Sequence, residues 1–216
     1  MTLKLYTCLG SGNAYKAELM LHLLDLRYEA ITVNIPRGEQ NKPEFLALTP
    51  FGQIPVLVDD AGLYTDSQAI LCYLARAYGG AHADTWFPAE AAPLAHVMRW
   101  LSVAANEIQN GLTLARAIKR LGWARDYAGA VARGYKILGL MDAHLQDRDW
   151  LATGKTTVAD IACYPYVLLA PEGGIDIAPY THVNRWLRRV ESIPRFWPMP
   201  RIPGLPAIPL VPPPPN

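Results

Sequence analysis

The stretch TPFGQIPVL, residues 49–57, decides the fold of this chain. It places Pro55, preceded by Ile54, at the point where a run of strand-forming residues begins. An X–Pro bond is the one kind of peptide bond that adopts the cis form readily. A cis bond here would leave the backbone of Ile54 unpaired beside the sheet, where an extended peptide could dock as an added strand. The plainer interpretation is that Pro55 begins an edge strand, and the stretch alone supports both equally.

The spacing of apolar residues around this stretch predicts an α/β unit. Strands are predicted over 3–7, 31–35, 56–58 and from 63, and helices over 14–26, 43–48 and 67–77. Residues 59–62, Asp-Asp-Ala-Gly, predict a hairpin turn. The order β-α-β-α-β-β-α favours parallel pairing with an antiparallel edge. Thioredoxin-like domains have this order and keep a cis-proline at the position of Pro55.

Beyond Gly79 and Gly80 the periodicity becomes purely helical. Apolar residues from Leu94 to Leu112 predict one long helix of about 30 residues. Further helices are predicted over 124–146, 157–170 and 181–191. The end of the chain is rich in proline, which excludes regular helix and central strand.

These changes divide the chain into two domains and a tail. We expect a thioredoxin-like α/β domain over 1–80, an all-α domain over 89–200 and a proline-rich tail over 201–216.

Composition excludes several classes of function. The net charge is +1 at pH 7, which disfavours a nucleic-acid partner. No stretch approaches the roughly 20 apolar residues of a membrane helix, and the N-terminus lacks a signal-peptide pattern. The three cysteines, Cys8, Cys72 and Cys163, lie far apart, and no histidines show metal-binding spacing. We therefore expect no metal site, no membrane association and a cytoplasmic location.

Asp66 and Ser67 precede the predicted helix over 67–77. A short acid and a hydroxyl are typical of a helix N-cap, and taken alone that interpretation is favoured. The alternative is a ligand site, in which the helix N-terminus holds a carboxylate and Asp66 pairs with an ammonium. The head group of a free amino acid carries both charges.

Ser11 and Asn13 lie where the first strand gives way to the first helix. The positive end of a helix favours an anion, and a thiolate is an anion that such a position stabilises. The plainer interpretation is that Ser11 is a turn residue and Asn13 an N-cap, and it is favoured if the segment stands alone.

Three segments in this order closely resemble the cytosolic glutathione transferase superfamily: SGNAYK (11–16), PEFLALTPFGQIPVL (43–57) and DSQAILCYLA (66–75). The resemblance extends to residues 157–160, Thr-Val-Ala-Asp, whose spacing is that of a capping box, and covers the chain to about residue 198. It implies a thioredoxin-like N-terminal domain followed by an all-helical glutathione transferase C-terminal domain. It also implies glutathione as co-substrate, without a metal.

The resemblance assigns the glutathione contacts residue by residue. The segment of Gln53, Ile54 and cis Pro55 would pair with the cysteinyl unit through the Ile54 backbone. Asp66 and Ser67 would hold the γ-glutamyl head.

Three further positions complete the implied site. Gln40 stands where many relatives carry histidine and would bind the glycyl carboxylate. Ser11 matches the hydroxyl that bonds the glutathione sulfur in serine-type transferases. Asn13 matches the asparagine that does similar work in bacterial disulfide-bond reductases.

The resulting hypothesis is an enzyme that transfers glutathione to small apolar electrophiles. The apolar half of its site would come from Leu9, Trp100, Leu101, Ala104, Ala105 and Ile108. Two alternatives stay open: a glutathione-dependent disulfide-bond reductase and a non-catalytic adaptor, because fold does not determine function. The resemblance also implies a homodimer.

Overall fold

The computed structural model describes residues 3–200, which form two units. One unit comprises residues 3–87 together with 194–200, and the other comprises residues 88–193. The sequence analysis extended the helical domain to residue 200, whereas the structure groups residues 194–200 with the first unit. The predicted proline-rich tail, residues 201–216, lies outside the described residues.

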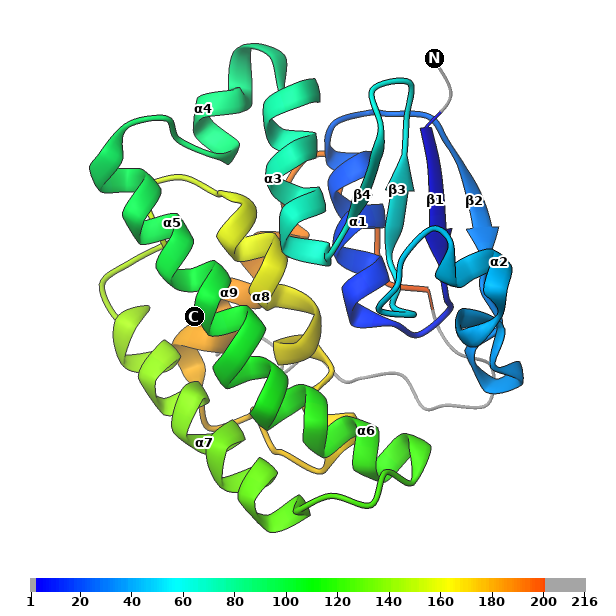
Figure 1. Cartoon of the computed structure of the whole chain (residues 1–216). Coiled ribbons are helices and arrows are strands. Elements are labelled where there is room, and N and C mark those ends of the chain that lie inside the picture. Colours follow the sequence, from blue (N-terminus) through cyan, green and yellow to red (C-terminus); the bar gives the residue numbers. More distant parts are fainter. Residues whose placement is uncertain (1–2, 201–216) are drawn as a thin grey trace. The chain divides into compact units, whose positions relative to one another are not determined.

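The first unit is built on a four-stranded sheet of order β2-β1-β3-β4 (Figure 1). Its strands are β1 (Leu3–Thr7), β2 (Tyr28–Thr32), β3 (Val56–Val58) and β4 (Leu63–Thr65). β1 pairs with β2 in parallel, while the β1–β3 and β3–β4 pairs are antiparallel. The accompanying α-helices are α1 (Gly12–Leu23), α2 (Pro43–Leu46), α3 (Ser67–Tyr78) and α4 (Ala83–Trp86). This is the predicted thioredoxin-like arrangement.

Side chains alternate across this sheet and bury both of its faces. Leu5 lies opposite Leu57 in the β1–β3 register, and both are fully buried. On the other face Val56 packs in a cluster with Phe45 of α2, and the ring of Tyr6 meets that of Phe45 edge-on at 6.0 Å. The sheet is therefore an inner layer, and its connecting loops are left to form a site.

The predicted strand over 31–35 is wrong by about three residues. β2 runs from Tyr28 to Thr32 and pairs with β1 over its whole length. The apolar alternation at Val33 and Ile35 has another cause, because both pack into the cluster around Phe45 after the strand has ended. Ile35 begins a short 3₁₀-helix, η1 (Ile35–Arg37).

Residues 194–200 return to the first unit and contact α1. The Tyr15 hydroxyl donates a hydrogen bond to the backbone oxygen of Trp197 at 2.6 Å. The Trp197 ring stacks on that of His22 with centroids 4.5 Å apart, and Arg195 pairs with Asp25 at 3.1 Å. These contacts explain why the segment belongs to this unit.

The second unit is helical. It contains α5 (Ala91–Val103), η4 (Ala104–Thr113), α6 (Leu114–Leu121), α7 (Tyr127–His144), α8 (Val158–Leu168), η5 (Ala170–Gly173) and α9 (Thr181–Glu191). The predicted long helix is confirmed as the continuous run from α5 to α6, with η4 as a π-helical segment in its middle. No helix within residues 3–200 is long and apolar enough to cross a membrane.

The predicted capping box on α8 is confirmed. Thr157 is the N-cap, and the Asp160 side chain accepts a hydrogen bond from the Thr157 N–H at 2.9 Å. Asp160 is fully buried and also accepts from the Leu151 N–H and from the Trp186 indole, each at 3.0 Å. Burial raises the pKa of the Asp160 carboxyl, although these donors favour its charged form. One carboxylate thus joins α8, α9 and the loop before α8.

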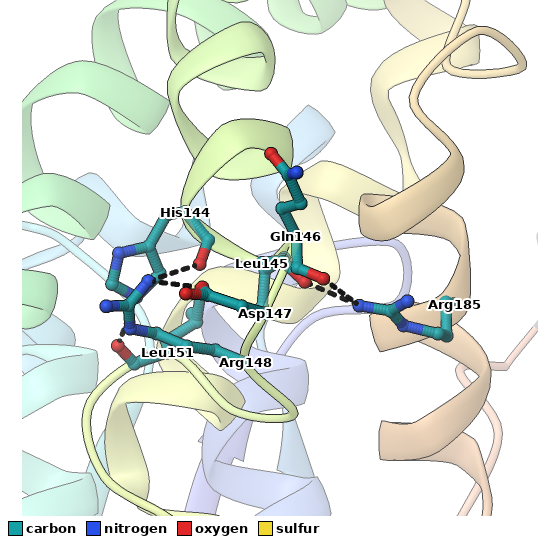
Figure 2. Close-up of polar contacts among 7 residues, drawn as sticks. All are labelled: His144, Leu145, Gln146, Asp147, Arg148, Leu151 and Arg185. Atoms are coloured by element: carbon teal, nitrogen blue, oxygen red, sulfur yellow. Dashed lines mark hydrogen bonds and ion pairs between the residues drawn. The ribbon is translucent and has the colours of Figure 1, made fainter.

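The C-terminal end of α7 is capped by two arginines (Figure 2). Arg185 of α9 donates to the carbonyl oxygen of Leu145 at 2.5 Å and faces that of Gln146 at 3.4 Å. Arg148 donates to the carbonyl oxygen of His144 at 3.1 Å. The last carbonyls of a helix have no partner within the helix, so these cations stabilise its end. Arg185 therefore has a structural role.

Candidate functional site

The N-terminus of α1 carries Ser11 as its N-cap. The Ser11 side-chain oxygen accepts a hydrogen bond from the backbone N–H of Ala14 at 3.2 Å. Gly10, with φ +82°, makes the preceding turn. Ser11 thus lies at the positive end of the helix, as expected.

Asn13 is the second residue of α1 and not its cap. Its side-chain oxygen accepts a hydrogen bond from Nζ of Lys16 at 2.8 Å and lies 3.4 Å from the hydroxyl of Ser67, the first residue of α3. α1 and α3 pack against one another, so their N-termini meet at this point. The structure brings together Asn13 and Ser67, which the sequence analysis had assigned to different parts of one ligand.

Asp66 is the N-cap of α3, as its sequence position predicted. Its carboxylate accepts hydrogen bonds from the backbone N–H groups of Gln68 and Ala69, at 2.9 and 3.0 Å. Asp66 has φ +69° and ψ 127°, a positive-φ conformation that residues other than glycine rarely adopt. Asp66 is exposed while Ser67 is buried, so the carboxylate is accessible beside the helix N-terminus.

The peptide bond between Ile54 and Pro55 is cis, which confirms the expectation for this stretch. Ile54 lies outside the strand ladder, whose first paired residue on this strand is Val56. Gln53 is exposed, Ile54 is half-buried and Pro55 is buried. The segment thus leads from the surface into the sheet.

Gly52 and Gln40 bring a second loop up to this segment. Gly52 has φ +59°, and a Cβ on it would lie 3.0 Å from the backbone oxygen of Gln40. Glycine therefore permits both the backbone conformation and the close approach. The side-chain oxygen Oε1 of Gln40 is buried and has no hydrogen-bond partner among the described residues.

The predicted apolar residues lie in different surroundings. Leu9 belongs to the first unit and is 53% exposed. Trp100, Leu101, Ala104 and Ile108 are buried on α5 and η4, and Ala105 is exposed. Within the helical unit the ring of Trp100 lies 4.9 Å from that of His144. Trp100 is therefore part of this unit's core, and its role as pocket lining stays a prediction.

The cysteines do not provide an activated thiolate. Burial, with the negative charge of Glu18 as a smaller cause, raises the pKa of the Cys8 thiol against a hydrogen bond from Ile35. Burial and the Asp66 charge raise the pKa of Cys72 to about 11. Cys163 is fully buried inside α8. Within residues 3–200 no group of three or more potential ligands is arranged to hold a metal ion.

Lys16 is the residue at this site to which the sequence analysis gave no role. It lies in the quoted SGNAYK segment, and its spacing of three from Asn13 in a helix was a usable signal. Its burial, with 1% of its surface exposed, was not predictable from a pattern that treats lysine as a solvent-facing residue.

Comparison with known proteins identifies relatives over nearly the whole chain. Residues 5–82 match the family model of the glutathione S-transferase N-terminal domain, and residues 122–194 match that of the C-terminal domain. Glutathione S-transferase 3 of Zea mays is 33% identical over 207 residues, 90% of this chain and 91% of the relative. The disulfide-bond oxidoreductase YfcG of Escherichia coli K12 is 31% identical over 195 residues, 84% of this chain and 87% of the relative.

A solved structure supports the same relationship. A possible glutathione S-transferase from Rhodopseudomonas palustris superposes with a TM-score of 0.84 and 35% identity, covering 93% of this chain and 99% of that chain. With both domain models matched in order and a fold that agrees, the chain belongs to the cytosolic glutathione S-transferase superfamily of enzymes.

Proposed function

We propose that this protein binds glutathione on its first unit and transfers it to small apolar electrophiles. The observation that carries the proposal is the meeting of two helix N-termini, where Asn13 of α1 lies 3.4 Å from the Ser67 hydroxyl of α3. Each N-terminus is an anion site, and glutathione carries two carboxylates and an ionisable thiol. The two ends suit different anions of one ligand.

The ligand contacts follow from this placement. Asp66 and the buried hydroxyl of Ser67 would receive the ammonium and carboxylate of the γ-glutamyl head. The free backbone edge at Ile54, beside cis Pro55 and the exposed Gln53, would pair with the cysteinyl unit. The side-chain amide nitrogen of Gln40, the donor end of that group, would donate to the glycyl carboxylate.

The thiol would then lie at the N-terminus of α1. A free thiol of pKa about 8.5 is only a few per cent ionised at neutral pH, and a helix N-terminus lowers such a pKa. Ser11 and the Asn13 amide nitrogen would donate hydrogen bonds to the sulfur. The raised pKa of Cys8 supports a thiolate supplied by the ligand rather than by the protein.

The reaction needs no protein nucleophile. The glutathione sulfur forms a bond to an electrophilic carbon, the leaving group departs with the electron pair of its bond, and the thiol proton passes to solvent. The apolar side would come from Leu9 and the predicted residues of α5 and η4, which remain part of the proposal.

A second activity on the same site is reduction of glutathionyl disulfides. Asn13 favours it, as does the similarity to a relative named a disulfide-bond oxidoreductase. In that reaction the thiolate of one glutathione attacks a mixed disulfide, forms glutathione disulfide and releases the other thiol.

Titration calorimetry with glutathione and with S-methylglutathione tests the binding. We expect both to bind with one site per chain. Rates with a chloronitroarene and with hydroxyethyl disulfide then separate the two activities. Failure of both ligands to bind at millimolar concentration would refute glutathione chemistry and leave the adaptor hypothesis.

The homodimer and a reducing, cytoplasmic compartment belong to the same proposal. The three cysteines are free, which suits a reducing environment. Light scattering tests the dimer, and a mass near the 23.9 kDa of one chain at micromolar concentration would contradict it.

A further inference from the structure

The first half of α1 contains a buried lysine that the roles above do not use. Only 1% of the surface of Lys16 is exposed. Its Nζ donates a hydrogen bond to the side-chain oxygen of Asn13 at 2.8 Å. Burial of an ammonium group is costly unless partners compensate for the lost water, so lysine is almost never fully buried without them. The position of this lysine beneath Asn13 therefore calls for an explanation.

Lys16 determines which way the Asn13 amide faces. An ammonium group has three donors and no acceptor, so the amide atom that it contacts must be the oxygen. The amide nitrogen Nδ2 then lies on the opposite side of the planar group. Turning the amide over would replace an attractive contact with two opposed donors. Lys16 thus selects one of the two amide orientations, which are otherwise nearly equivalent in shape.

Ser67 reinforces this choice but does not make it. Its hydroxyl lies 3.4 Å from the Asn13 oxygen and 2.6 Å from Oε1 of Gln68. A hydroxyl has one proton for these two acceptors, so the shorter bond to Gln68 takes it for most of the time. The donor that is committed to the Asn13 oxygen is therefore Lys16.

We propose that Lys16 is a positioning residue, which holds Asn13 so that its Nδ2–H is presented to the sulfur of bound glutathione. This rests on the proposed function, because it needs a thiolate at the N-terminus of α1. Lys16 acts through Asn13 and need not touch the ligand. Asp66, at the start of α3, is a titratable group next to Ser67, and its carboxylate is already bonded to two backbone N–H groups.

The test is the pH dependence of thiolate absorbance in the complex of the full chain with glutathione. Lys16→Met keeps most of the side chain but removes the donor. We expect it to raise the pKa of the bound thiol by about one unit, which is about a tenfold loss of thiolate below that pKa. Lys16→Arg, which retains donors, should keep the thiol pKa close to that of the wild-type protein. Affinity for S-methylglutathione, which has no thiol proton, should change less than about twofold, because on this proposal Lys16 acts through Asn13.

Two matched comparisons sharpen the result. Lys4→Met changes an exposed lysine on β1 of the same unit, paired with Glu29 at 3.8 Å, and should leave the thiol pKa unchanged. In an Asn13→Ala background, Lys16→Met should add little further shift, because the group that it positions is absent.

Three outcomes would overturn the proposal. One is a thiol pKa unchanged by Lys16→Met in a folded protein. Another is a shift of the same size in the Asn13→Ala background, which would mean that Lys16 acts by its charge alone. The third is a wild-type protein that binds neither glutathione nor S-methylglutathione, which would refute the proposed function as well. If Lys16→Met does not fold, Lys16→Arg and Lys16→Gln are compared in both backgrounds by the same criteria.

Discussion

The hydroxyl of Tyr15 donates a hydrogen bond of 2.6 Å to the backbone oxygen of Trp197, joining α1 to a segment 182 residues further along the chain. Tyr15 is buried and lies between Ala14, whose N–H donates to the capping oxygen of Ser11, and Lys16. The segment that leaves the helical unit therefore supports the helix on which the candidate site is built.

The first prediction concerns this support. Trp197→Ala removes the ring that stacks on His22 at 4.5 Å, and Tyr15→Phe removes the hydrogen bond. We expect each to lower the free energy of unfolding by about 1–2 kcal/mol. Urea denaturation measures it. Arg195→Ala is the control, because its ion pair with Asp25 is exposed and should be worth less than about 1 kcal/mol. Equal losses in all three variants would contradict the prediction.

The second prediction concerns how the free energy of unfolding depends on pH, through titratable groups around the β3–β4 hairpin. Asp59 accepts hydrogen bonds from the hydroxyls of Tyr73 and Tyr78 and from the N–H groups of Ala61 and Gly62. Burial opposes its ionisation, but these bonds together lower the pKa of Asp59. A lowered pKa contributes stability above the unfolded-state value of 3.8, which is lost as pH falls through the folded-state value.

The alkaline side has the opposite sign. Burial and the bond to Asp59 raise the pKa of Tyr78 from 10.0 to about 12. The stability that this provides is complete below pH 10.0 and is lost as pH rises toward about 12. Unfolding midpoints across pH measure both limits. We expect Asp59→Asn to destabilise the protein at pH 7 and to differ less from wild type below pH 4. Asp60→Asn, at an exposed position in the same turn, should leave the acid limit in place.

The third prediction concerns the buried carboxylate of the helical unit. Asp160→Ala leaves the N–H groups of Leu151, Thr157 and Trp186 without their acceptor. Each buried unsatisfied donor costs about 1–3 kcal/mol, so we expect a loss of about 3 kcal/mol or more. Thermal melting should show it as a large fall in Tm. Asp147→Ala provides the comparison, since that side chain is 74% exposed and pairs with its neighbour Arg148. A Tm as high as that of Asp147→Ala would show that Asp160 is not structurally important.

Much of the fold was predictable from local patterns. The capping box at Thr157 and Asp160 and the N-cap at Asp66 follow from residue types at short spacings. The cis bond before Pro55 was expected from the thioredoxin-like order of elements, since the local stretch alone left it open. The position of β2 could not be predicted in this way, because the apolar alternation of Val33 and Ile35 reflects packing against Phe45 rather than strand pairing. Periodicity reports which side chains are buried and not which backbone groups are paired.

At the candidate site, too, some features were predictable from the sequence and others were not. Ser11 and Asn13 were found by sequence, but their local roles differ from the plain interpretation: Ser11 caps α1 and Asn13 lies within it. The burial of Lys16 and the contact of Tyr15 with Trp197 depend on segments far apart in the chain. No local spacing encodes such contacts, so only the folded arrangement reveals them.

The last prediction concerns how Ser11 and Asn13 share the thiolate. One hydrogen bond to a charged group is worth about 1.5–3 kcal/mol, or roughly ten- to a hundred-fold in rate when lost in full. A second donor and the helix N-terminus remain in each single variant. Ser11→Ala and Asn13→Ala should therefore each raise the pKa of the bound glutathione thiol by less than the shift that full loss of such a bond would cause, which is about 1–2 units. The double variant should raise this pKa further. Thiolate absorbance against pH measures each step. If only Asn13→Ala moves the curve, Ser11 serves as the N-cap alone and the reductase activity gains support. Cys8→Ala is the control, and its loss of activity would mean that a protein thiol carries the reaction.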